Sequence, residues 1–536
     1  VVWAIYTTNN WIFPLRNGET IPSKPPLFHW LGTVVSKSLG TVNEFTIRFP
    51  SALLATAGVL LTYCTGAYFW NPAVGLVAAL VLATSFEWWF AAVSARVDMT
   101  LTFFLLCFFL FFYVSYRFGG RKRDSIALGV LLGLAILAKG PLGLLLPCAT
   151  VLVFLWLERD LSFIRNRLHP FILLLVAATV AGSWYLLAIL QGGTSFVSRV
   201  IHENLESAVG IASHRKPFYY FVPGLFQGMA PWSLFLPSVG VFLYRYRHRF
   251  KEAGLLYLVV WFGVVFAFFS AAVGKRTVYI LPLYPAASLI FGIWCNKLNE
   301  ESFSSARWLA RVAGIVIGGL FVLSAVLVGL ATPDFIGHVR LFLRPRDQAQ
   351  VALITDLMTE HRFAVVIWAI AAALGGVVAI MASRKAAWMA SVLAITMVMA
   401  ASFLLMQNIF HPQLAAAYSF RPFMDRVSRR VNGEPLYFCD SIDPIDPDVL
   451  FYAYRNIPQY ENRTTTTERP FYLLLWDDEW KRITNRGGLT VVDASEEKDR
   501  DKYRHLMLVR VNETTRLEEK LVTCKAPASG RPDTEE

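Results

Sequence analysis

Charged residues are scarce in this chain. Asp, Glu, Lys and Arg make up 16% of its 536 residues, whereas hydrophobic residues make up 55% and the mean hydropathy is +0.48. Soluble globular domains carry about 25% charged residues. The composition therefore excludes an ordinary soluble globular protein and indicates a membrane protein.

Motifs for nucleotide binding are also missing. No Walker loop and no Gly-x-Gly-x-x-Gly fingerprint stands between a strand and a helix, and the sequence has no heptad run or solenoid period. The net charge of +12 would favour a nucleic-acid partner in a soluble protein. In a membrane protein, however, Lys and Arg collect in cytoplasmic loops. We therefore expect neither a nucleotide donor nor a nucleic-acid partner.

An initiator methionine and a cleavable signal are absent before the first hydrophobic segment. We therefore expect the natural start of the protein to lie before Val1.

Long hydrophobic stretches are abundant. A membrane-spanning helix needs about 20 apolar residues, and about twelve stretches are candidates, with 124–138 the shortest. They are 45–69, 73–92, 97–117, 124–138, 140–157, 169–190, 221–244, 252–271, 277–296, 308–331, 363–383 and 386–407. The sequence thus predicts an all-α polytopic domain over residues 1–407.

The charges of the connecting loops predict the orientation of these spans. Lys and Arg concentrate in alternate connections, at 117–124, 158–168, 245–251 and 384–385. By the positive-inside rule these connections are cytoplasmic. The opposite connections, at 191–220 and 332–362, are then predicted to lie outside, together with Val1 and everything after about residue 408.

The composition becomes polar after residue 407. Short apolar runs in 408–536, "EPLYFC", "FYLLLW" and "HLMLVRV", are typical of strands between turns and predict a small exoplasmic α/β domain. Cys439 and Cys524 both fall in this domain, where a disulfide between them is permitted. The acidic stretch 440–448 lacks the spacing of a calcium loop, and we interpret it as a solvated turn.

Several cations lie on the side where the positive-inside rule does not expect them. Each stands just before a predicted inward-running helix, and prolines suited to a first helical turn follow two of them. These cations are Lys24, Arg96, Lys139, Lys275 and Arg276. Helix N-termini beside fixed cations bind anions. The alternative is that these side chains only reach toward lipid headgroups.

The phosphate of a lipid fits such a site, with its tail between the helices. Leu27, Leu31, Val34 and Val35 recur at helical spacing and indicate an interfacial helix. Aromatic residues nearby, Phe28, Trp30, Trp88 and Trp89, would frame the site.

Asp98 is the candidate acid in the expected cavity, because an ionisable residue at membrane depth is a site candidate by default. It could instead be only a helix N-terminal acid beside Arg96. The outer stretch 199–221 adds Glu203 and His214 as cavity candidates. Its spacing matches no strong metal motif, so His214 is a weak metal candidate and a polar loop is the favoured interpretation.

Six motifs in this order resemble the polyprenyl-phosphate-sugar-dependent GT-C glycosyltransferases, in particular lipid A aminoarabinose transferases and protein mannosyltransferases. The motifs are "NWIFPLRNGETIPSKPPLFHWL", "NEFTIRFPSAL", "SARVDM", "AKGPL", "HRKPFYYFVPGLFQGMAPWSLFLP" and "GKRTVYILPLYPA". The likeness covers roughly residues 7 to 290. It implies a bundle of about thirteen helices in a bacterial inner membrane, one of them before Val1. The active cavity and the C-terminal domain would face the periplasm.

The resemblance also implies roles for single residues. Lys24 would contact the donor phosphate, Lys139 and Arg276 would help to hold it, and Asp98 matches an acidic position of the family. Tyr279 in the last motif would line the cavity. The chain departs from the family pattern at two places: the favoured catalytic acid of the family belongs before Val1, and Ser23 stands where aminoarabinose transferases tend to carry Glu.

The implied reaction is the transfer of a single sugar from an undecaprenyl-type phosphate to lipid A, another glycan or a protein. No cofactor is required, although a divalent metal remains open. The alternative is a transporter or flippase of lipid-linked sugars, which would show paired repeats and midplane charges that are not evident in this sequence.

Overall fold

The chain divides into two units in the computed structural model. The structure describes residues 1–18, 24–209, 216–251, 254–330, 345–439, 447–460, 470–483, 486–495 and 505–512. One unit comprises Val1–Pro14 and Ile21–Leu405, and the other comprises Leu15–Thr20 and Met406–Glu536. Nothing in the sequence patterns signals that the short segment near the N-terminus joins the second unit.

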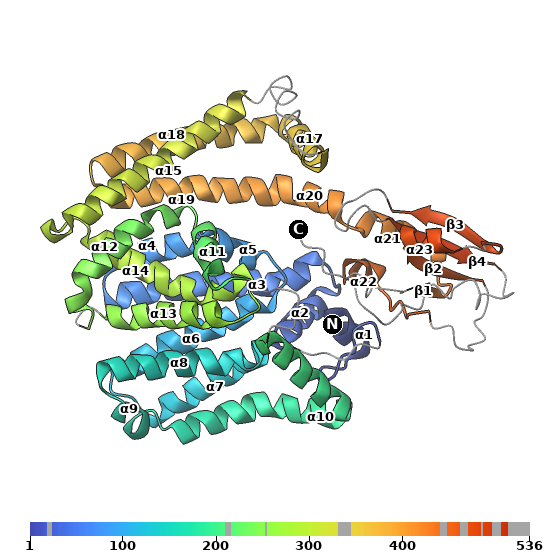
Figure 1. Ribbon diagram of the computed structural model, residues 1–536, viewed down its shortest axis with the longest axis horizontal. Helices are drawn as coiled ribbons and strands as arrows, with labels where there is room; N and C mark the ends of the chain where they lie inside the picture. Colours follow the sequence, from blue (N-terminus) through green and yellow to red (C-terminus); the bar gives the residue numbers. More distant parts are fainter. Residues whose placement is uncertain are drawn as a thin grey trace. The chain divides into compact units, whose positions relative to one another are not determined.

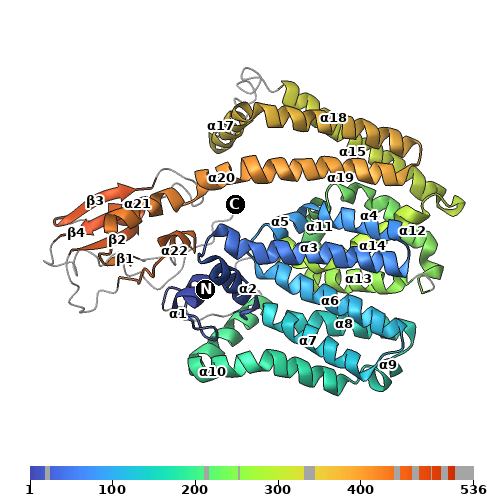
Figure 2. The same ribbon diagram turned by 180° about the vertical axis from the view of Figure 1, so that it is seen from behind.

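The first unit is helical (Figures 1 and 2). Its helices are α1 (Val2–Thr8), α2 (Leu27–Leu39), α3 (Glu44–Phe69), α4 (Pro72–Ala83), α5 (Phe86–Ala92), α6 (Val97–Arg117), α7 (Lys122–Lys139), α8 (Leu142–Glu158), α9 (Ser162–Asn166), α10 (Pro170–Val209), η1 (Phe218–Tyr220), α11 (Phe221–Gly228), η2 (Trp232–Phe235), α12 (Leu236–Tyr246), η3 (Arg247–Arg249), α13 (Leu255–Ala271), η4 (Thr277–Leu283), α14 (Tyr284–Lys297), η5 (Glu301–Phe303), α15 (Ser304–Leu330), α17 (Pro345–Glu360), α18 (Arg362–Arg384) and α19 (Trp388–Leu405).

Seven helices of the described residues are long and apolar enough to cross a membrane, or up to nine if each bent pair counts as one span. The protein is therefore a multi-pass integral membrane protein. The three other predicted stretches also fold as helices. Helices α8 and α13 are shorter apolar helices of 17 residues, and α7 carries charges at both ends.

Helix α3 shows how these helices pack. Its buried positions carry mostly small or hydroxyl residues, whereas large apolar residues such as Phe45, Leu53 and Leu60 are exposed. Gly66 meets Gly75 of α4 so closely that a Cβ atom on Gly66 would lie 2.6 Å from the Gly75 Cα. Small residues at helix contacts and large apolar residues outside are the pattern of a bundle surrounded by lipid.

Among the described residues, two pairs of apolar helices bend sharply at a short break. Helices α4 and α5 meet at 67°, and the helical segments Phe218–Gly228 and Trp232–Arg249 meet at 110°. The two breaks contact each other, because the indole Nε1 of Trp232 donates a hydrogen bond of 3.0 Å to the Thr84 hydroxyl. Buried polar groups are thereby satisfied where helical hydrogen bonding stops.

Helix α10 extends further than the predicted span 169–190. It continues through a kink at Gly193, whose backbone is non-helical, and ends at Val209. Part of the stretch that the sequence predicts as an outer polar loop is therefore helical.

The second unit contains a four-stranded mixed sheet (Figure 1). Its elements are η6 (Met406–Phe410), α20 (His411–Tyr418), α21 (Arg421–Val431), β1 (Leu436–Phe438), α22 (Pro447–Ala453), β2 (Phe471–Trp476), α23 (Asp477–Arg482), β3 (Leu489–Ala494) and β4 (Leu506–Val511). The strand order is β1-β2-β4-β3, with β1 parallel to β2 and the other pairs antiparallel. The three predicted strand runs are confirmed.

Candidate functional site

An ion pair between two helix ends is the centre of the candidate site. Asp98 lies in the first turn of α6, and Lys139 is the last residue of α7. The Lys139 Nζ donates a hydrogen bond of 2.5 Å to the Asp98 Oδ1, and the two side chains are only 14% and 12% exposed. An acid at a helix N-terminus and a cation at a helix C-terminus both suit the helix dipoles. Two residues that the sequence singled out separately are thus brought together.

Tyr279 of η4 belongs to the same centre. The Lys139 Nζ lies 4.2 Å from the centroid of the Tyr279 ring, within the range of a cation–π interaction. Tyr279, predicted as a cavity residue, therefore contacts one of the predicted phosphate-binding lysines.

A tight turn fixes Lys139 at the end of α7. Gly140 has a φ of 67°, a conformation that favours glycine. Gly143 follows so close to α7 that a Cβ atom there would lie 2.3 Å from the carbonyl carbon of Ala135. Gly140 and Pro141 of the "AKGPL" motif, with Gly143 directly after it, thus let α8 return directly against α7. Pro141 is the N-cap of α8 rather than its first helical residue.

Three other predicted phosphate ligands are exposed. Arg96 is the N-cap of α6, Arg276 is the N-cap of η4, and Lys24 lies two residues before Pro26, the N-cap of α2. The Lys24 ammonium interacts electrostatically with His29. These positions at helix starts agree with the sequence interpretation, while their role toward phosphate stays a prediction.

Lys275 differs from the other cations because its side chain is buried, at 4% exposure. Its ammonium donates hydrogen bonds to the backbone carbonyls of Lys216, at 3.2 Å, and Ala272. These hydrogen bonds hold the Lys275 side chain to the backbone. Its role as a phosphate ligand stays a prediction.

Helix α2 has apolar side chains that the described residues leave exposed. Val34 and Leu39 are 53% and 56% exposed, whereas the opposite side is held to α3 by a buried hydrogen bond of 3.0 Å between Ser36 and Thr46. The exposed Val34 supports the predicted interfacial helix. Of the other three predicted positions, Leu27 is buried at 8% exposure, and Leu31 and Val35 are half-buried. The predicted aromatic frame is only partly available, because Phe28 and Trp88 are buried in the protein.

Glu87 is a functional candidate that the sequence reasoning missed. It is the only charged residue in the stretch 73–92 and is 6% exposed in the structure. Its isolation within a hydrophobic stretch could have identified it from the sequence, because ionisable residues at membrane depth usually have a function.

Some predicted residues cannot be placed. His214 and Cys524 lie outside the described residues, and the same holds for the side chain of Glu203. Cys439 is disulfide-bonded, while Cys64, Cys107, Cys148 and Cys295 are free. Within the described ranges, no group of three or more His, Cys, Asp or Glu side chains could hold a metal ion.

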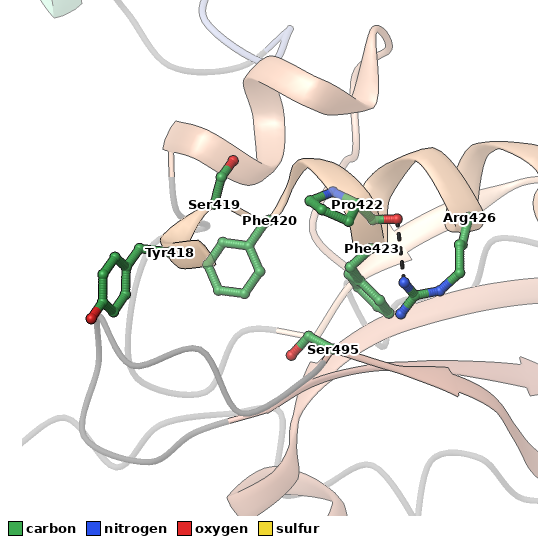
Figure 3. Close-up of a pocket in the computed structure, with 7 residues that line it drawn as sticks. All are labelled: Tyr418, Ser419, Phe420, Pro422, Phe423, Arg426 and Ser495. Atoms are coloured by element: carbon green, nitrogen blue, oxygen red, sulfur yellow. Dashed lines mark hydrogen bonds between the residues drawn. The ribbon is translucent and has the colours of Figure 1, made fainter. Parts of the chain in front are cut away.

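The second unit contains a small pocket between α20, α21 and the end of β3 (Figure 3). Its lining residues are Tyr418, Ser419, Phe420, Pro422, Phe423, Arg426 and Ser495. Its one charged group is already engaged, because Arg426 forms an ion pair of 3.0 Å with Asp493 and also donates to the carbonyls of Pro422 and Ala494. No other charged side chain lines this pocket. The Asp98–Lys139 centre is therefore the stronger candidate for a functional site.

Comparisons with known proteins agree on one class. Residues 23–186 match the family described as dolichyl-phosphate-mannose-protein mannosyltransferase. The structure is also similar to the crystal structure of ArnT from Cupriavidus metallidurans bound to undecaprenyl phosphate, with a TM-score of 0.72 and 18% identity over 95% of this chain and 92% of that chain. The resemblance to GT-C polyprenyl-phosphate glycosyltransferases is therefore confirmed, and the ArnT likeness establishes the fold.

Two curated proteins are similar to this chain in sequence. The chain is 30% identical over 342 residues to the undecaprenyl phosphate-alpha-4-amino-4-deoxy-L-arabinose arabinosyl transferase 1 of Pseudomonas fluorescens, covering 62% of this chain and 59% of that protein. It is 29% identical over 308 residues to an uncharacterized protein of Aquifex aeolicus, covering 57% and 59%. The chain thus spans about three fifths of the length of these curated relatives.

Proposed function

We propose that the protein is a membrane glycosyltransferase that transfers one sugar from a polyprenyl phosphate to an acceptor. The observation that carries this proposal is the buried Asp98–Lys139 pair with Tyr279 beside it. The pair lies within the segment that matches the lipid-phosphate mannosyltransferase family.

The chemistry follows from the charge that develops on the leaving group. The bond between the sugar C1 and the phosphate oxygen breaks, and a hydroxyl oxygen of the acceptor forms the new bond to C1. The leaving polyprenyl phosphate gains negative charge, which Lys139, Arg276 and Lys24 stabilise. Preorganised cations aimed at developing charge are usually the largest contribution in such sites.

Asp98 serves this reaction in one of two ways. It orients Lys139 through the 2.5 Å hydrogen bond, or it accepts the proton that the acceptor hydroxyl loses. No cofactor is needed for the transfer itself, because the donor already carries its activated phosphate bond. A divalent metal remains open.

The site faces the periplasm in this proposal. The basic connections at 117–124, 158–168, 245–251 and 384–385 support that orientation through the positive-inside rule. The twelve predicted spans between residues 45 and 407 would place all four connections on one side.

The donor class is undecaprenyl phosphate carrying a single sugar, as the names of the arabinosyl transferase relatives suggest. The acceptor is lipid A, another glycan or a protein. The departure at Ser23, a residue outside the described ranges, argues against choosing aminoarabinose over other sugars.

A transfer assay tests the proposal. Membranes containing the wild type, Lys24→Ala or Asp98→Asn are supplied with a radiolabelled polyprenyl-phosphate sugar mixture, and label in the acceptor fraction is measured. We expect transfer by the wild type and a loss of at least about 100-fold in Asp98→Asn at equal expression. Movement of intact donor across the membrane without any transfer would instead support the transporter alternative.

A further inference from the structure

Arg311 is a charged residue of a membrane helix that the proposed mechanism does not use. It lies in α15, near the start of the predicted span 308–331. Its Nε atom is buried and has no hydrogen-bond partner among the described residues, whereas the residue as a whole is half-buried. An unpaired buried donor is unfavourable, and an ionisable residue at membrane depth is a candidate site. Arg311 is therefore a candidate for contact with a molecule outside the protein.

Arg307, one helical turn earlier, is fully engaged. Its guanidinium donates hydrogen bonds of 3.1, 3.1 and 2.8 Å to the backbone carbonyls of residues 298–300, just after α14. Residues four apart lie on the same face of a helix, so Arg311 follows Arg307 on the face turned toward the end of α14. The carbonyls there are satisfied by Arg307 and not by Arg311.

The turn between α18 and α19 borders Arg311. Helices α15 and α18 pack side by side (Figures 1 and 2). A Cβ atom on Gly314, three residues after Arg311, would lie 2.0 Å from the Ser383 hydroxyl. On the other side of Arg311, the Asn299 side chain donates a hydrogen bond of 3.5 Å to the Ala386 carbonyl. Arg311 thus lies between two contacts that reach this turn.

Exposed cations on the same turn add positive charge. Arg384 is the last residue of α18 and Lys385 is its C-cap, and both are exposed. No carboxylate in the described part of the chain pairs with Arg384, Lys385 or Arg311. The nearby Glu300 pairs instead with Lys297, at 2.9 Å. An anion at this end of α15 would therefore meet uncompensated positive charge.

A stripe of exposed apolar side chains runs along α15 beside Arg311. This lipid-facing stripe consists of Trp308, Val312, Val316 and Leu320. The spacing of four residues places them on one face of the helix. Lipid chains cover such a face in a membrane protein, and tryptophan is typical of the level where hydrocarbon meets the headgroups. The stripe and Arg311 therefore match the tail and the head of one lipid.

We propose that Arg311, with Arg384 and Lys385 on the neighbouring turn, binds the phosphate of an anionic phospholipid whose acyl chains cover the lipid-facing stripe. The planar donor set of a guanidinium matches two phosphate oxygens, which makes arginine a specific phosphate ligand. Basic groups between membrane helices bind phospholipid headgroups in this way. An arginine that only reached toward bulk headgroups would not bury its Nε atom.

This lipid site is separate from the Asp98–Lys139 centre. Tyr279 of that centre lies in η4, from which α14 leads to the carbonyls that Arg307 binds. The 14 residues of α14 span about 21 Å. Under the proposed orientation, Arg311 lies in the cytoplasmic leaflet. The lipid at Arg311 is therefore not the donor at the Asp98–Lys139 centre, and the inference stands without the proposed function.

Native mass spectrometry of the full chain in detergent tests the inference. The protein is titrated with phosphatidylglycerol, which is anionic, or with phosphatidylcholine of the same acyl chains, which has no net charge. We expect the wild type to bind its first phosphatidylglycerol about tenfold more tightly than phosphatidylcholine. Arg311→Gln should lose that preference. Inorganic phosphate at millimolar concentration should not displace the lipid, and displacement would overturn the lipid assignment in favour of a site for a free anion.

Arg247→Gln is the matched control, because it removes the same charge from another basic connection. Its guanidinium already donates a hydrogen bond of 2.7 Å to the Tyr244 carbonyl, so this variant should keep the preference of the wild type. Equal losses in Arg247→Gln and Arg311→Gln, or a wild type without any preference, would overturn the proposal. If Arg311→Gln fails to fold, the exposed double variant Arg384→Gln/Lys385→Gln decides: we expect a loss of at least about threefold, and an unchanged preference would refute the site.

Discussion

Asp98 and Lys139 are each mostly buried, so each depends on the charge of the other. Removing one member of a buried ion pair leaves an uncompensated charge and costs about 3–5 kcal/mol, whereas replacing both is often neutral. We therefore expect Lys139→Met to lower thermal stability in detergent more than the double variant Asp98→Asn/Lys139→Met does. Both variants should lose transfer activity. Equal destabilisation of the single and double variants would contradict the pairing.

The hydroxyl of Tyr284 gives a second prediction at the scale of one atom. It is fully buried and has no hydrogen-bond partner among the described residues. A buried unsatisfied polar group costs about 1–3 kcal/mol. We expect Tyr284→Phe to fold normally and to unfold at the same or a higher temperature than the wild type. A clear loss of stability would show that the hydroxyl has a partner.

The sequence predicts the members of the site better than their contacts. Lys139, Asp98 and Tyr279 stand out because charge or motif marks each of them. Their distances depend on the packing of α6, α7 and η4, which no local pattern specifies. Glu87 was not predicted, because the expected site was built on cations near predicted helix ends. Its isolation as the one charged residue in the apolar stretch 73–92 marks it equally well.

At the scale of elements, the contact between α3 and α4 has a sharp steric requirement. A Cβ atom on Gly75 would lie 2.4 Å from the Tyr63 carbonyl oxygen, a backbone atom that cannot rotate away. Overpacking of this kind costs about 1–3 kcal/mol. We expect Gly75→Ala to lower the unfolding temperature in detergent.

Gly263 of α13 is the matched control for Gly75→Ala. A Cβ atom there meets nothing within 4 Å among the described atoms. Since alanine favours a helix over glycine by about 0.5–1 kcal/mol, Gly263→Ala should be neutral or stabilising. If both variants behave alike, the helix contact is not the cause.

Asp477 at the start of α23 predicts a pH dependence in the second unit. Burial raises the pKa of Asp477, but hydrogen bonds from Lys481 Nζ and the His505 backbone N–H, together with their charges, outweigh it and lower the pKa below its ordinary value of 3.8. A depressed acid pKa stabilises the fold above that value, and the contribution is lost as pH falls through the lowered pKa.

The test compares the unfolding temperature of wild type and Asp477→Asn across pH. We expect the wild type to be more stable at about pH 6 and the difference to shrink as pH falls below about 4. A difference that persists unchanged in acid would show that the carboxylate charge is not the cause.

The positions of helices were more predictable than their directions. Each predicted hydrophobic stretch coincides with a helix or with a broken helix, because apolar composition marks the segments that lipid and protein can cover. The stretches 73–92 and 221–244 nevertheless bend sharply. Their bends depend on partners such as the Trp232–Thr84 hydrogen bond, which hydropathy does not register.

At the scale of the whole molecule, the sheet too was only partly predictable from the sequence. The runs that became β1, β2 and β4 are apolar and were predicted. Strand β3 was missed because "LTVVDA" is partly polar, and two of its positions with apolar side chains, Val491 and Val492, are half-exposed or exposed. The strand exists because it pairs with β4, a tertiary contact.

The proposed orientation predicts which loops face which side of the membrane. In a background without the four free cysteines, single cysteines at Arg121 and Arg247 should resist a membrane-impermeant maleimide in intact cells, and one at Glu360 should react. The physical reason is the positive-inside bias of the basic connections. Reaction at all three positions, or the reverse pattern, would overturn the orientation.

Mass spectrometry of the membrane lipids tests the central claim most directly. A transferase converts the polyprenyl-phosphate sugar into free polyprenyl monophosphate, and a transporter leaves the donor mass unchanged. We predict that membranes with the wild type accumulate the monophosphate as the donor disappears, and that membranes with Asp98→Asn at equal expression retain the donor. An intact donor in wild-type membranes, with sugar-free monophosphate absent while an acceptor is supplied, would contradict the assignment as a glycosyltransferase.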